Sequence, residues 1–130
     1  MRVFCLGTLL ALLPGVLAAA GDNPARTIEL LAKDNKFKVV GLKKGPLVLR
    51  AGETVTFNVT AYRGDAVADD GAVHSFVVRK LRDSGWDVRL KEGRQEFTLT
   101  APPPGEYWIE CTVICGQGHE DMHLKLVVEP

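Results

Sequence analysis

The stretch Ile109–His123, IECTVICGQGHEDMH, concentrates the sulfur and imidazole groups of this chain. It holds two of the three cysteines, two of the three histidines and one of the two methionines. The spacing within it is Cys111-x3-Cys115-x3-His119-x2-Met122, and the remaining histidine, His74, opens the apolar segment HSFVV. Thiolate, imidazole and thioether groups are soft or borderline metal ligands, and together they favour copper. The stretch therefore predicts a copper site, and the fold has to bring His74 to it.

The second cysteine separates this ligand set from simpler metal sites. Zinc would accept two thiolates and two imidazoles but would leave Met122 unused. A mononuclear blue-copper site uses one thiolate, two imidazoles and a weak axial thioether, so one cysteine would be left over. Two thiolates can instead bridge two coppers, with the Met122 sulfur and a main-chain carbonyl of the loop as the remaining contacts. The structural alternative is a Cys111–Cys115 disulfide, which is the usual outcome for two cysteines in an oxidising compartment.

The rest of the chain reads as short strands separated by turns. In TVTFNVTAY, Val55, Phe57 and Val59 alternate with polar residues, which indicates a strand with one buried face. Turn signals recur about every 8–12 residues, and no segment has a helical period, so we expect an all-β sandwich. Further strands are expected at residues 26–32, 37–42, 74–81, 86–90, 95–101 and 123–129. Tyr107 and Trp108 are expected in its core.

The first twenty residues resemble a targeting segment. Arg2 precedes the apolar run Val3–Leu17, and small residues follow to Ala20, which is typical of a cleaved signal peptide. We therefore expect a signal peptide at residues 1–20, a domain at 21–130, and export to the periplasm or another exported location. The alternative is that Val3–Ala20 is retained as a single membrane anchor, since its length is at the short edge of a membrane span.

Composition excludes several other classes of protein. The formal net charge is +0, whereas a nucleic-acid-binding protein would carry a basic excess. There is no second hydrophobic stretch, which excludes a multi-span membrane protein. The residues after position 20 are numerous enough for one independent core.

The segments HSF, PGEYWIEC and CTVICGQGHEDM resemble the binuclear copper A (CuA) cupredoxin domain. This domain occurs in subunit II of haem–copper cytochrome oxidases and at the C-terminus of nitrous oxide reductase, and the resemblance spans about Leu30 to Glu129. It implies a cupredoxin-like Greek-key β-sandwich that binds two copper ions. The implied ligands are the imidazoles of His74 and His119, the bridging thiolates of Cys111 and Cys115, the axial thioether of Met122 and the main-chain carbonyl of Val113.

Three features depart from the oxidase subunit. That subunit usually has an acidic residue at the position of Val113, the present chain has no pair of hydrophobic segments for a two-helix membrane hairpin, and it lacks the aromatic-rich run that typically precedes the domain. The resemblance therefore implies a free-standing or singly anchored domain.

The expected function is one-electron transfer between redox proteins, without bond-making chemistry by this chain alone. The expected donor is a c-type cytochrome and the expected acceptor is a terminal oxidase or reductase. Two alternatives stay open: a copper chaperone for oxidase assembly, and a singly anchored oxidase subunit II. His123 is expected to face solvent because its neighbour Met122 faces the metal. We hypothesise that a docking face for a basic cytochrome is formed by the acidic residues Asp65, Asp69, Asp70, Glu120 and Asp121.

Overall fold

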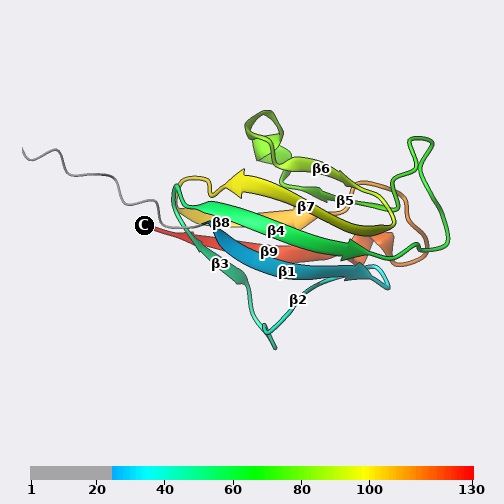
Figure 1. Cartoon of the computed structure of the whole chain (residues 1–130), viewed down its shortest axis with the longest axis horizontal. Helices are drawn as coiled ribbons and strands as arrows, with labels where there is room; N and C mark the ends of the chain where they lie inside the picture. The colour runs from blue at the N-terminus through cyan, green and yellow to red at the C-terminus, as the bar shows by residue number, and fades with distance from the viewer. Residues whose placement is uncertain (1–24) are drawn as a thin grey trace, which may run out of the picture.

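The computed structural model describes residues 25–130, so the expected signal peptide at residues 1–20 lies outside the described residues (Figure 1). The described part forms two sheets, with strand orders β2-β1-β4-β7 and β3-β9-β8-β5-β6. The pairs β1–β4 and β3–β9 are parallel, and the other pairs are antiparallel. The strands are β1 (Arg26–Lys33), β2 (Lys36–Val39), β3 (Leu47–Arg50), β4 (Thr54–Ala61), β5 (His74–Val77), β6 (Asp87–Leu90), β7 (Gly93–Thr100), β8 (Gly105–Glu110) and β9 (His123–Glu129). The expected all-β sandwich is confirmed.

The core lies between the two sheets and is rich in aromatic rings. The alternation expected in β4 is confirmed, since Val55, Phe57 and Val59 are each 0% exposed. The Phe57 ring lies 5.0 Å from the Phe76 ring and stacks on Phe97 at 5.6 Å. Trp86 stacks on Phe76 at 6.2 Å. Because Phe57 and Phe97 come from one sheet and Phe76 from the other, these contacts join the two layers.

The segment expected to be one strand at residues 74–81 divides into two elements. Strand β5 ends at Val77, and the 3-10 helix η1 (Arg79–Ser84) follows it. The reason is the antiparallel pairing of β5 with β6, in which Val77 lies opposite Asp87, so the chain has to reverse between them. Gly85, with a φ of 91°, ends the helix in the left-handed region, where glycine carries no steric penalty. Across residues 25–130, no helix combines the length and apolar character needed to cross a membrane.

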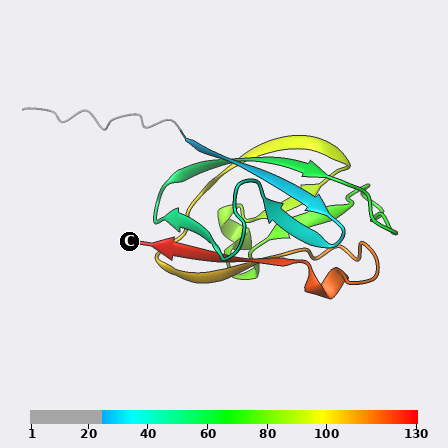
Figure 2. The ribbon, with the colours of Figure 1, turned by 90° about the horizontal axis from the view of Figure 1, so that it is seen from below.

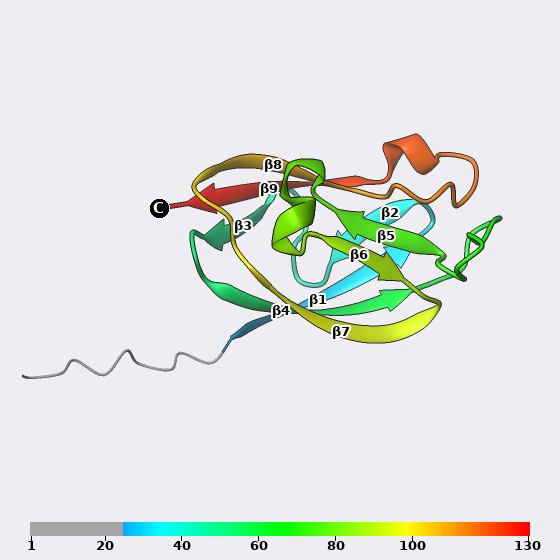
Figure 3. The same ribbon diagram turned by 90° about the horizontal axis from the view of Figure 1, so that it is seen from above.

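Three connections gather at one end of the sandwich (Figures 2 and 3). They are the β1–β2 turn, the connection between β4 and β5, which we call the β4–β5 loop (residues 62–73), and the connection between β8 and β9, which we call the ligand loop (residues 111–122). The C-terminus lies at the opposite end. This topology brings His74, at the start of β5, to the same end as the ligand loop.

Candidate metal centre

The ligand loop is closed at its base by the sheet. Strands β8 and β9 are antiparallel, with Glu110 opposite His123 as their last pair. The next residues continue this ladder, because the Cys111 amide donates to the Met122 carbonyl at 3.1 Å. Cys111 and Met122, the first and last residues of the ligand loop, therefore lie side by side at its base.

Within the loop, two glycines reverse the chain and return it toward the sulfurs. Gly116 and Gly118 have φ values of 138° and 83°, in the region that other residues rarely adopt. The short 3-10 helix η2 (His119–Asp121) follows, and the His119 amide donates to the Gly116 carbonyl at 3.2 Å. This turn brings His119 Nδ1 to 3.6 Å from Cys115 Sγ.

The donor atoms of His74, Cys111 and Cys115 all lie within 4.8 Å of one another. The three residues are 1%, 5% and 0% exposed, so the cluster is shielded from water. The two sulfurs are 3.9 Å apart, whereas a disulfide bond is about 2.05 Å long, and both cysteines are free. The structure therefore presents two separate thiols and an imidazole at one buried point.

The imidazole of His74 is oriented for binding through Nδ1. Its Nε2 lies 2.8 Å from the Tyr62 carbonyl, which can only accept, so the proton is on Nε2. Nδ1 is buried and has no hydrogen-bond partner. Burial lowers the pKa of His74, against the opposing effect of the Tyr62 carbonyl, and His119 lowers it further. The neutral ring thus keeps a free lone pair on a buried nitrogen of a residue whose imidazole belongs to the cluster.

Cys115 is strongly held in its protonated form when no metal is present. Burial, and then the neighbouring Cys111, raises the pKa of Cys115 to about 12. A thiol has to lose its proton to bind a metal, so metal binding here has to release protons.

The other expected ligands lie around this cluster. The Val113 carbonyl accepts from Cys111 Sγ at 3.3 Å, which places the backbone oxygen beside a sulfur. Met122 is 1% exposed and connects to Cys111 through the backbone bond at the base of the loop. The structure thus brings together His74, Cys111 and Cys115 directly and His119 through Cys115; the role of each as a metal ligand stays a prediction.

The β4–β5 loop packs closely on the ligand loop. The Ala66 amide donates to the Cys115 carbonyl at 3.3 Å. A Cβ atom at Gly64 would collide with that same carbonyl oxygen, and one at Gly116 would lie 2.8 Å from Asp65 Oδ2. Glycine at position 64 is therefore required by the close approach of two backbones.

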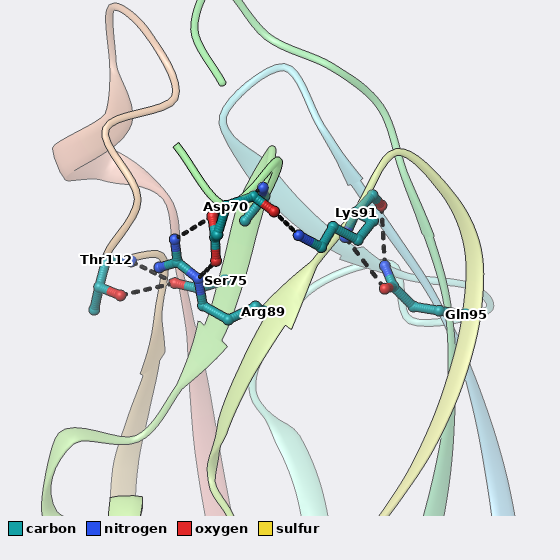
Figure 4. A network of polar contacts seen from close by, with 7 residues as sticks. Asp70, Ser75, Arg89, Lys91, Gln95 and Thr112 are labelled. Carbon is teal, nitrogen blue, oxygen red and sulfur yellow. Dashed lines mark hydrogen bonds and ion pairs between the residues drawn. The ribbon is translucent and has the colours of Figure 1, made fainter. Parts of the chain in front are cut away.

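A polar network that the sequence did not indicate joins β5, which begins with His74, to the start of the ligand loop (Figure 4). Ser75 follows His74 and Thr112 follows Cys111; the Thr112 amide donates to Ser75 Oγ at 2.7 Å, and the two hydroxyls are 2.9 Å apart. Ser75 and Thr112 lie within the segments HSF and CTVICGQGHEDM, but the sequence does not show that they meet, because their contact depends on the pairing of β5 with β8.

A second part of this network holds the end of the β4–β5 loop. Asp70 accepts from Arg89 Nε at 2.8 Å and from Arg89 Nη2 at 2.9 Å, and it also accepts from the Ala72 amide at 3.1 Å. The Arg89 guanidinium, and then the Ala72 amide, hold the pKa of the Asp70 carboxyl well below its usual range. Lys91 donates to the Asp70 carbonyl (Figure 4). The loop is thus fixed to β6 just before His74.

Asn35 also touches the cluster, and no metal-ligand pattern in the sequence includes it. Its carboxamide oxygen accepts from Cys115 Sγ at 3.2 Å, and its Nδ2 donates to the Gln117 carbonyl. The only signal in the sequence is the Asp34-Asn35 pair between two expected strands, which is typical of a hairpin turn but not of a metal site.

On the outer face of the second sheet, the structure contradicts the burial expected for Trp108 and agrees with the exposure expected for His123. Trp108 was expected in the core, but it is 50% exposed; Trp86 is the buried tryptophan, at 1%. In Tyr107-Trp108-Ile109 three apolar residues follow one another, so the sequence does not show which face each takes, and Ile109 is the one fully buried. His123 is exposed, as expected, and packs edge-to-face on Trp108 at 5.0 Å.

No model of a known protein family matches the chain, and no curated protein matches it. Solved structures do match. A chain of a heme-copper terminal oxidase dimer studied by cryo-EM has 23% identity and a TM-score of 0.56, covering 97% of this chain and 78% of that one. Auracyanin A, a "blue" copper protein from the green thermophilic photosynthetic bacterium Chloroflexus aurantiacus, has 22% identity and a TM-score of 0.53, covering 82% and 100%.

A third match comes from the mixed disulfide between a thioredoxin-like protein and subunit II of cytochrome c oxidase. It has 16% identity and a TM-score of 0.54, and it covers 80% of this chain and 81% of that one. At these identities the likeness concerns the fold, and it confirms the expected cupredoxin-like Greek-key β-sandwich.

Proposed function

We propose that this chain is an exported one-electron carrier built around a binuclear copper centre of the CuA type. The observation that carries the proposal is the buried convergence of two free thiols with the imidazole of His74 within 4.8 Å, together with the lack of any partner for Nδ1 of that imidazole. A buried polar atom without a partner is costly, so its presence calls for an explanation, and a bound metal supplies one. The donor set of thiols, imidazoles and a thioether fits copper better than zinc.

Each ligand has a distinct role in this proposal. The two sulfurs would hold both copper ions, because they lie 3.9 Å apart and each has an imidazole nitrogen nearby. The proposed ligands are Cys111 Sγ, Cys115 Sγ, His74 Nδ1, the imidazole of His119, Met122 Sδ and the Val113 carbonyl. Copper bound there would take up one electron from a donor and pass it to an acceptor.

The protein supplies rigidity and exclusion of water. The Tyr62 carbonyl holds the His74 ring in one tautomer, which is the usual role of a partner behind a metal-binding histidine. The Ser75–Thr112 bonds and the bond between the Cys111 amide and the Met122 carbonyl fix the Cys111 end of the ligand loop to the sheet, and the Ala66 amide holds the Cys115 carbonyl. Little movement of the ligands on electron transfer is therefore expected.

We propose a c-type cytochrome as donor and a terminal oxidase or reductase as acceptor, with the chain itself not an enzyme. Exposed acidic residues at the loop end of the molecule support a basic docking partner: Asp65, Asp69, Glu120 and Asp121. Asp70 is paired with Arg89 and leaves this set. The heme-copper oxidase and "blue" copper chains of similar fold support the same setting.

The test is to load the reduced protein with copper and to measure metal content, absorption and EPR. We expect two coppers per chain and a seven-line hyperfine pattern, because one electron shared equally by two copper nuclei gives that splitting. Replacing Cys115 with Ser removes one bridge and should leave at most a mononuclear site, since a hydroxyl is a poor bridge for copper. One copper per wild-type chain with a four-line pattern would contradict the binuclear centre.

A further inference from the structure

The β1–β2 turn reaches the ligand loop from the other sheet through a single side chain. Lys33 pairs with Lys36, so Asp34 and Asn35 form a two-residue turn, and both have positive φ values, 52° and 54°. This conformation is typical of hairpin turns and suits Asn and Asp. Asn35 is half-buried against the loop, whereas Asp34 is exposed.

The carboxamide of Asn35 contacts two successive parts of the loop. Its Oδ1 accepts from Cys115 Sγ at 3.2 Å, and its Nδ2 donates to the Gln117 carbonyl. A Cβ atom at Gly118 would lie 3.4 Å from Nδ2, so the loop backbone also packs against this side chain. One residue, 80 positions away in the sequence from Cys115, therefore fixes both a sulfur and the segment that leads to His119.

We propose that Asn35 is a positioning residue of the metal centre, which holds the Cys115 sulfur in place and donates a hydrogen bond to it once it is a thiolate. This inference rests on the proposed function. A thiol donates, but a metal-bound thiolate can only accept, so Oδ1 would then face a second acceptor. Turning the carboxamide over about its last torsion presents Nδ2–H to the sulfur instead and gives up the bond from Nδ2 to the Gln117 carbonyl.

An N–H donor at the sulfur has a definite electrochemical consequence. It stabilises negative charge on the thiolate and reduces the donation of that charge to the metal, which favours the reduced state and raises the reduction potential. Groups behind the ligands of a metal site commonly tune it in this way. A residue that only stabilised the loop would not act on the reduction potential through such a hydrogen bond.

Two substitutions separate these roles, with a matched control. Asn35→Gly removes the carboxamide and keeps the positive φ, and Asn35→Asp keeps the shape but has no N–H to donate. Asp34→Gly is the control, because it alters the same turn at an exposed side chain of similar φ. We expect both Asn35 variants to lose about 10- to 100-fold in copper affinity, the usual range for groups behind a ligand, and the control to retain it. Loaded Asn35→Asp should have a lower reduction potential than the wild type.

The metal-free, reduced protein provides a readout that does not depend on copper. Alkylation of Cys115, followed by peptide mass spectrometry, should be about fivefold faster in Asn35→Gly, as expected for the loss of one ordinary hydrogen bond. The rate should be unchanged in Asp34→Gly. A wild-type protein that binds no copper, but whose Cys115 reactivity responds to Asn35 alone, would refute the proposed function and still support the hold of Asn35 on the sulfur. Unchanged Cys115 reactivity in Asn35→Gly, or equal potentials in Asn35→Asp and the wild type, would overturn the inference.

Discussion

His74 illustrates how a single residue is prepared for a metal by its surroundings. A buried nitrogen without a partner costs about 1–3 kcal/mol, and Nδ1 of His74 is such an atom. The other ring nitrogen, Nε2, already bonds to the Tyr62 carbonyl, so rotating the ring would not give both nitrogens a hydrogen-bond partner. The cost is understandable if Nδ1 is kept free as a ligand atom.

A substitution at Met122 tests its proposed role as the axial ligand. Met122→Leu conserves volume, so we expect the free energy of unfolding to change by less than about 1.5 kcal/mol. An axial thioether is a weak, long contact, so the centre should still load copper but with an altered reduction potential. Cyclic voltammetry of the loaded protein checks this, with Leu126→Met, another fully buried position, as the control. Failure of Met122→Leu to load copper would contradict a weak axial contact and make the Met122 sulfur essential to copper binding.

The two thiols make copper uptake dependent on redox state. Cys111 and Cys115 are 3.9 Å apart at the sulfurs, close enough to be oxidised to a disulfide after a small movement of the loop. A disulfide offers no thiolate, so air-exposed, metal-free protein should take up no copper until a reductant is added. Thiol titration and copper analysis after air exposure measure both quantities. Full loading of air-exposed protein whose thiols still titrate as free would contradict the prediction.

At the scale of elements, the site depends on how closely two loops pack. Gly64 touches the Cys115 carbonyl, and a methyl group there forces the β4–β5 loop away from the ligand loop. We expect Gly64→Ala to weaken copper binding while the sheets keep their far-UV circular dichroism. Gly45→Ala is the matched control, because its Cβ meets no atom within 4 Å although its φ of 92° adds strain. Equal copper affinities for the two variants, measured by competition with a chelator, would contradict the role of this contact.

The Asp70–Arg89 pair gives the β4–β5 loop a pH dependence. The pKa of Asp70 is lowered in the folded protein, chiefly by hydrogen bonds from Arg89. Its contribution to stability is therefore present above the unfolded value of about 3.9 and is lost as the pH falls below it. Arg89→Gln should return the pKa of Asp70 toward 3.8, which carboxyl NMR titration can measure. Arg82→Gln breaks a different ion pair, with Asp87, and should leave Asp70 unchanged.

At the scale of the whole molecule, the aromatic core holds the sheet that carries His74 against the other sheet. Phe76 is 0% exposed and lies within 5.0–6.2 Å of four other aromatic rings, including Phe57 and Trp86. Phe76→Ala should lower the free energy of unfolding by about 3–5 kcal/mol, because it leaves a cavity. Urea denaturation of the metal-free protein measures this. Phe97→Ala, at a partly exposed position of the same cluster, should cost clearly less; equal costs would contradict this view of the core.

What the sequence alone determined is local. The spacing of Cys111, Cys115, His119 and Met122 places four donors in one loop. Because these residues are close along the chain, the prediction that they lie near one another needs no knowledge of contacts with distant segments. The alternation in β4 predicted its buried face for the same reason, since neighbouring strand residues point to opposite sides. The strand bounds are not local in the same way, because the reversal after Val77 depends on the pairing of β5 with β6.

Only the tertiary structure decided which distant groups meet. Asn35, Tyr62 and Gly64 reach the cluster from other connections, and Ser75 of β5 meets Thr112 of the ligand loop. The faces of Trp86 and Trp108 were likewise decided by the sheets. The physical reason is that these contacts join residues far apart along the chain, so their geometry is set by strand order and sheet packing, which no short stretch of sequence contains.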